Sequence, residues 1–180
     1  MCWPSWPRLR PGPILPEAWQ HPQAVAYARL LADSLHRLTG RAMVDLSLPD
    51  AALAAALWDM PQPLVSHGTT PDPVFRHANR AALALWEMDW DSFTRLPSRR
   101  SAEPEAGIQT DRSAFLARAL QQGWVDGYEG IRISATGRRF RIADTLLWTV
   151  TDAQGTRHGQ AALIGRVTPL PFQGDAGAVR

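Results

Sequence analysis

Residues 64–104, LVSHGTTPDPVFRHANRAALALWEMDWDSFTRLPSRRSAEP, decide the fold of this chain. The stretch begins apolar, turns at TTPDP and becomes apolar again at Val74, which predicts a β-hairpin over 64–69 and 74–78. Asn79 then stands where a helix N-cap is favoured, and RAALALWEM follows with apolar residues at helical spacing. The stretch ends in an arginine-rich loop, PSRRSAEP, at 97–104. It therefore predicts two strands that lead into short helices.

Two amphipathic helices are predicted upstream of this stretch. The first covers 23–38 and ends at Gly40, a favoured helix stop. Its apolar face consists of Val25, Ala28, Leu31, Ala32, Leu35 and Leu38. The second covers 51–59, where Ser47 and Asp50 have the spacing of a capping box. Both helices need a partner surface for their apolar stripes, because such stripes supply most of a short helix's stability.

A third helix and three strands are predicted downstream. Residues 111–122 have an apolar stripe at helical spacing. The apolar period then changes from about 3.6 to about 2 over 128–135, 138–152 and 159–167, which indicates an antiparallel meander. Together these elements predict an α+β fold with a PAS-like layout. It consists of one five-stranded antiparallel sheet with crossover helices on one face and the N-terminal helices on the other.

The same patterns predict four segments. Residues 1–22 form a proline-rich leader without a signal peptide's apolar centre, and we expect it to be disordered. Residues 23–62 form an N-terminal helical extension, 63–168 the PAS-like core, and 169–180 a flexible tail. No apolar run is long enough for a membrane span, so no membrane association and a cytoplasmic location are expected.

Composition excludes several chemistries. All nineteen basic residues are arginine, so phosphate loops and Schiff-base sites that require lysine cannot form. Cys2 is the only cysteine, which excludes intramolecular disulfides and thiolate-rich zinc sites. The formal charge is +2 and the arginines are scattered, so no nucleic-acid partner is expected.

The quoted stretch, together with GYEGIRISATGRRFRI (127–142) and VTDAQGTRHGQAAL (150–163), closely resembles the MEKHLA domain family over roughly 24–167. This family is a PAS-like module found alone in bacteria and algae and at the C-terminus of plant homeodomain-leucine zipper transcription factors. The chain resembles the standalone bacterial type. The resemblance implies a sensory or interaction domain, and it does not transfer the plant DNA-binding function.

The arginine-rich loop supplies the first candidate site. Arg99, Ser101 and Glu103, with Arg132 and Arg139 on nearby strands, could frame a pocket for a carboxylate or phosphate, which the guanidinium fork fits. The preferred alternative is a structural network in which Arg99 pairs with Glu103 or Asp91 and holds the loop to the sheet.

Two further candidates concern an unknown cofactor, with haem and flavin as the alternatives. His67 or His77 could ligate haem. Trp86, Trp124 and Trp148 could stack on a planar ligand such as flavin. A structural role is the alternative for each of them. Cysteinyl-flavin photochemistry is excluded, because the chain has no Asn-Cys-Arg string.

No catalytic or metal-ligating residues are predicted, because the chain lacks GxSxG, HExxH and related spacings. The leading hypothesis is a sensory module, not an enzyme, that binds a small molecule between the sheet and its crossover helices. It would signal through protein association, as a homodimer joined by the first helix or with a protein partner. The alternatives are a ligand-free interaction domain with a filled core and, least favoured, a hydrolase-like enzyme that pairs His67 with Glu103 or Asp72.

Overall fold

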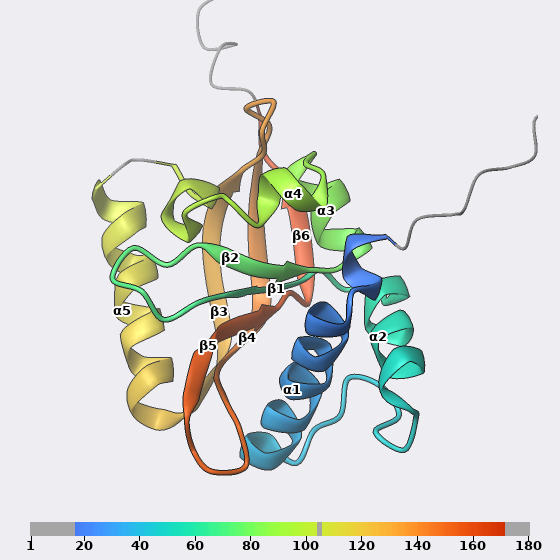
Figure 1. Ribbon diagram of the computed structural model, residues 1–180. Helices are drawn as coiled ribbons and strands as arrows, with labels where there is room; N and C mark the ends of the chain where they lie inside the picture. Colours follow the sequence, from blue (N-terminus) through green and yellow to red (C-terminus); the bar gives the residue numbers. More distant parts are fainter. Residues whose placement is uncertain (1–16, 104–105, 172–180) are drawn as a thin grey trace, which may run out of the picture.

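The computed structural model describes residues 17–103 and 106–171 (Figure 1). The chain begins with η1 (Ala18–Gln20), a 3-10 helix, followed by α1 (Pro22–Thr39), α2 (Asp50–Asp59), β1 (Leu64–His67) and β2 (Phe75–Ala78). The crossover contains α3 (Arg80–Trp86), α4 (Trp90–Phe93), the 3-10 helix η2 (Ser98–Ser101) and α5 (Ala106–Gln122). The last strands are β3 (Trp124–Ile133), β4 (Arg139–Thr151), β5 (Arg157–Leu163) and β6 (Arg166–Pro169).

All strands form one antiparallel sheet in the order β2-β1-β5-β4-β3, with β6 also paired to β4. β5 and β6 pair with successive parts of β4, so six strands fill five positions. The predicted last strand is thus interrupted near Gly165, where a Cβ would lie 2.5 Å from the Asp144 carbonyl oxygen. Apart from this break, the PAS-like α+β prediction is confirmed.

A bulge in β4 exchanges the two faces of the sheet. Asp144 has a φ of 50°, and three steps along β4, from Ile142 to Thr145, face two steps along β3. One extra residue reverses which face each later side chain occupies. Phe140 and Ile142 therefore pack on one face, whereas Leu146 and Trp148 pack on the other.

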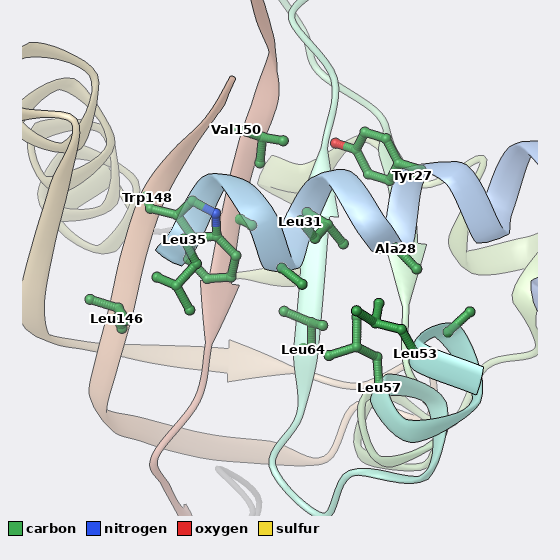
Figure 2. Packing of buried hydrophobic residues seen from close by; sticks show 13 residues of the cluster. Tyr27, Ala28, Leu31, Leu35, Leu53, Leu57, Leu64, Leu146, Trp148 and Val150 are labelled. Atoms are coloured by element: carbon green, nitrogen blue, oxygen red, sulfur yellow. The ribbon is translucent and has the colours of Figure 1, made fainter. Parts of the chain in front are cut away.

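α1 and α2 cover one face of the sheet, and α5 lies on the opposite side (Figure 1). The predicted stripe of α1 packs inward with Leu53 and Leu57 of α2 against Leu64, Trp148 and Val150 of the sheet (Figure 2). Leu31, Leu35, Leu53 and Leu57 are at most 1% exposed. The sequence alone suggests that this apolar stripe could join two copies of the chain. In the structure the stripe packs against α2 and the sheet of the same chain, so it gives no support for dimerisation through α1.

Asn79 joins α2, β1 and α3. Its Oδ1 accepts hydrogen bonds from the amides of Leu64 and Ala82, both at 3.0 Å, so it caps α3 as predicted. Its Nδ2 lies 2.9–3.2 Å from the carbonyl oxygens of Leu57, Met60 and Gln62. The side chain is fully buried, and every polar atom it carries is bonded.

The ends of other elements differ from prediction. The prediction of a capping box before α2 is wrong, because Ser47 donates to Asp45 and Pro49 is the N-cap. Within the predicted leader, η1 stacks Trp19 on Trp58 of α2, with ring centroids 5.4 Å apart. Residues 1–16 and 172–180, with Cys2 and most of the predicted tail, lie outside the described residues.

Candidate functional site

A pocket lies between the sheet and α5, on the face away from α1. Its interior volume is about 50 Å³. The walls come from β1, β2, α3, η2, α5, β3, β4, β5 and the residues just after β5. They consist of Val65, Ser66, His67, Phe75, Trp86, Ser101, Arg112, Leu116, Tyr128, Arg132, Ile142, Leu147, Gln160, Ala161, Ala162 and Ile164. Most of the wall is apolar, and a few polar groups converge on it.

Four of the predicted ligand-binding candidates line this pocket, namely His67, Trp86, Ser101 and Arg132. The candidates that do not line it are Arg99, Glu103, Arg139, His77, Trp124 and Trp148. Arg99 binds Asp72 with a 2.9 Å Nε–Oδ1 contact, and Arg139 forms a two-armed ion pair with Glu103. The loop network is therefore partly as expected, with Asp72 rather than Asp91 as a partner of Arg99.

The ion pairs hold the loop at both ends and let its serines face inward. Ser98 and Ser101 are buried, and Ser101 Oγ donates to the Ser98 carbonyl at 2.7 Å. Ser98 Oγ in turn accepts from Arg112 at 2.7 Å. The loop thus supports a pocket arginine, and of the predicted cluster Ser101 and Arg132 line the pocket.

Trp148 lies on the wrong face of the sheet to bind a pocket ligand. It is fully buried among α1 side chains, and its Nε1 donates to Ser34 Oγ at 3.0 Å. Strict alternation along an unbroken β4 would put Trp148 on the same face as Phe140 and Ile142. The bulge at Asp144 cancels that alternation.

Tyr128, Gly130 and Arg132 occupy alternate positions of β3. Arg132 is 6% exposed, and its guanidinium donates to Tyr128 Oη at 2.6 Å and to the Ile131 carbonyl at 2.8 Å. A Cβ at position 130 would lie 2.8 Å from Tyr128 Oη and 2.9 Å from Arg132 Nη1. The missing side chain of Gly130 therefore leaves the space in which these two groups meet.

Arg112 of α5 is a pocket residue that sequence reasoning missed. Burial and the nearby Arg132 charge lower the pKa of its guanidinium to about 10. A signal for it existed, because Arg112 precedes Leu116 by four residues and Ala119 by seven. A charged residue thus falls in the apolar stripe of a helix.

The two histidines of the first hairpin are buried and differ in surroundings. His67 Nδ1 lies 2.9 Å from the Gly68 carbonyl oxygen, and its Nε2 has no hydrogen-bond partner within the described part of the chain. Burial, with smaller effects from Arg112 and Arg157, lowers the pKa of His67. His77 contacts the rings of Tyr27 and Trp90 and does not line the pocket. Burial lowers the pKa of His77 to about 4.

The pocket does not fit haem or flavin. Pockets for ligands of drug or cofactor size measure roughly 300–1,000 Å³, several times the volume found here. His67 presents a nitrogen as an axial haem ligand would, but Trp86, Tyr128 and Ile142 leave no room for a macrocycle. The described residues also contain no group of three metal-ligating side chains, and no described helix has the length and hydropathy to cross a membrane.

The fold and pocket define a PAS-like domain, and solved structures agree. The PAS domain of a Colwellia psychrerythraea protein superimposes with a TM-score of 0.54 at 14% identity, covering 62% of this chain and 91% of that one. An RNA-binding light-oxygen-voltage receptor superimposes with a TM-score of 0.56 at 20% identity, covering 68% and 34% of the two chains. At these identities the likeness concerns the fold alone.

The particular family follows from the sequence. The MEKHLA domain model matches residues 25–168, so this chain belongs to the MEKHLA domain family. The homeobox-leucine zipper protein REVOLUTA of Arabidopsis thaliana is 27% identical over 131 residues. That match covers 72% of this chain and 15% of REVOLUTA, so the chain spans a small part of that relative.

Proposed function

We propose that this PAS-like sensory module binds a small molecule in the pocket between the sheet and α5 and passes the signal on by associating with a protein. The observation that carries the proposal is a pocket into which buried and half-buried polar groups converge. Arg112, Arg132 and the unpartnered Nε2 of His67 line it from three separate elements. Of these groups, His67 Nε2 is the one without a hydrogen-bond partner among the described residues, whereas both arginines are bonded to neutral groups. A buried unsatisfied atom costs free energy, so its position beside two arginines favours a ligand over simple core filling.

The pocket volume gives the rival proposal its support. A cavity of about 50 Å³ holds only about four water-sized groups, and a ligand-free interaction domain could fill it with water. An enzyme is less well supported, because Glu103 and Asp72 pair with Arg139 and Arg99 and do not line the pocket with His67.

Native mass spectrometry of the freshly purified chain tests ligand binding directly. We expect a mass excess of one small molecule that disappears on denaturation. If no excess is found, a metabolite mixture is added while the amide resonances of pocket residues are followed by NMR. A chain that carries no ligand and whose pocket resonances do not move with any mixture contradicts the proposal and supports the ligand-free domain.

Association is tested with light scattering of the same samples. We expect the measured molar mass to change when the ligand is added, either because the chain forms or loses a homodimer or because it binds or releases a partner protein. The contact must use a surface other than the inner stripe of α1, which is buried in the protomer.

A further inference from the structure

The pocket concentrates positive charge. Arg132 lies deep in it, 6% exposed, and Arg112 reaches it from α5. The two guanidinium groups are close enough for Arg132 to oppose the charge on Arg112. Like charges brought together in a desolvated space raise the free energy of the folded protein.

Among the described residues, none neutralises either charge inside the pocket. The partners of Arg132 are a phenol oxygen and a backbone carbonyl, and Arg112 bonds to the Ser98 hydroxyl. No carboxylate is among the described residues that line the pocket. Asp72 attracts the Arg112 charge from a position outside the pocket, where Asp72 forms an ion pair with Arg99. Buried cations normally have an anionic partner, so a position for a bound anion is left open.

A second group specifies more than charge. His67 Nδ1 faces the Gly68 carbonyl oxygen and therefore carries the ring proton in the neutral tautomer. Nε2 is then a hydrogen-bond acceptor without a partner, buried at the pocket wall. A ligand that satisfies both sides needs a negatively charged oxygen for the arginines and a hydrogen-bond donor for Nε2, and on a small oxyanion the most compact donor is a hydroxyl.

A surface depression adjoins the pocket. It is formed by the turn between β1 and β2, by α5 and by the start of β5. His67, Arg112, Leu116 and Gln160 line both spaces, and Arg157 lines the outer one. Arginines on both sides of the shared wall raise the local concentration of anions.

We propose that the pocket binds a compact oxyanion that carries a hydroxyl, with Arg132 and Arg112 holding the charged oxygens and His67 Nε2 accepting from the hydroxyl. Hydrogencarbonate, a protonated phosphate and a short 2-hydroxycarboxylate share this chemistry. The volume of about 50 Å³ admits about four water-sized groups and excludes larger acids. This inference rests on the proposed function and names the class of its ligand.

Calorimetric titration with glycolate, hydrogencarbonate and phosphate distinguishes the three sources. Acetate lacks the hydroxyl, and glycolamide lacks the charge. We expect one of the three anions to bind. If that anion is glycolate, acetate and glycolamide should each bind at least about tenfold more weakly. Arg132→Gln should weaken binding by at least about tenfold. The control Arg141→Gln removes an exposed arginine that pairs with Glu129 and should bind as the parent chain does.

The outcomes separate this inference from the proposed function. Native mass spectrometry could instead find a neutral molecule that binds the parent and Arg132→Gln equally. That result would overturn the inference that the ligand is an anion and leave the sensory proposal intact. No binding of any of the anions up to about 10 mM, where a millimolar ligand saturates, overturns the inference. Without an anion, Arg132→Gln loses the hydrogen bonds to Tyr128 and Ile131 but also removes one of two neighbouring buried charges, so its Tm should stay within a few degrees of the parent's. Added anion should raise the Tm of the parent and not that of Arg132→Gln. An equal rise in both variants would contradict the anion position.

Discussion

Replacing Asn79 by alanine should be among the most destabilising single changes in this chain. The substitution removes an N-cap, which contributes about 1 kcal/mol. It also leaves the buried Leu64 amide without its acceptor, at about 1–3 kcal/mol. The carbonyls of Leu57, Met60 and Gln62 lose a shared donor, which adds about 1 kcal/mol. We expect a total loss of about 3–5 kcal/mol from the free energy of unfolding.

Urea unfolding followed by circular dichroism measures this loss, and Asp89→Ala is the matched control. Asp89 also caps a helix, accepting from the Ser92 amide at 2.7 Å, but it bonds nothing in another element. It should therefore lose only about 1 kcal/mol. Equal losses in the two variants would refute the reasoning, because capping alone would then account for both.

Asn79→Asp separates the acceptor atom from the donor atom. Its carboxylate retains the oxygen that faces Leu64 and Ala82 but turns a second oxygen toward three carbonyls. The folded state should favour the protonated form and so raise the pKa of this carboxyl above its unfolded value. Its stability relative to the parent should be highest in acid and decrease as the pH rises through the raised pKa. A relative stability that does not change with pH would contradict this account.

Three further predictions concern the hairpin and the bulge. Burial lowers the pKa of His77 from 6.5 to about 4, so its contribution is complete above pH 6.5 and decreases as the pH falls toward 4. His77→Phe should abolish about 3 kcal/mol of that pH dependence in urea unfolding, and an unchanged dependence would count against a buried neutral imidazole. Asp144→Gly should unfold at the parent's urea concentration or above, whereas Asp144→Val should lose about 1–2 kcal/mol because of its left-handed backbone. Gly159→Ala would place a Cβ 2.0 Å from the His67 carbonyl oxygen, so its Tm should fall by several degrees. An unchanged Tm would contradict this, because β1 and β5 would then separate at no cost in stability.

Most of the elements and their order could be predicted from sequence because local signals mark them, but the break between β5 and β6 and the 3-10 helix η1 were not predicted. Asn79 caps α3 as the pattern indicates, and the α1 stripe is buried as its spacing indicates. Trp148 was misplaced because one extra residue at Asp144 reverses the alternation, and no local pattern marks a bulge there. Arg112 was missed because a helical stripe was read from its apolar members alone.

The pairing of Arg99 with Asp72 could not be predicted for another reason. The two residues lie 27 positions apart, and their meeting depends on how the loop before α5 returns to the turn between β1 and β2. Composition shows that arginines and carboxylates are available, but tertiary geometry decides which of them pair.

Because of the bulge at Asp144, β4 contributes to a packed core on one face of the sheet and to the pocket on the other. Beyond it, Leu146, Trp148 and Val150 complete a core of large apolar side chains with α1 and α2. On the other face, Ile142 and Leu147 line a pocket that contains two arginines. The faces remain joined, because Tyr27 of α1 lies 2.8 Å from Ser66 Oγ, which donates to the Gln160 carbonyl. The Gln160 side chain bonds to the Leu116 carbonyl of α5 across the pocket wall at 2.8 Å. The backbone of the pocket residue Gln160 is therefore joined to α1 by two consecutive hydrogen bonds through Ser66, in addition to the dense packing of the α1 core.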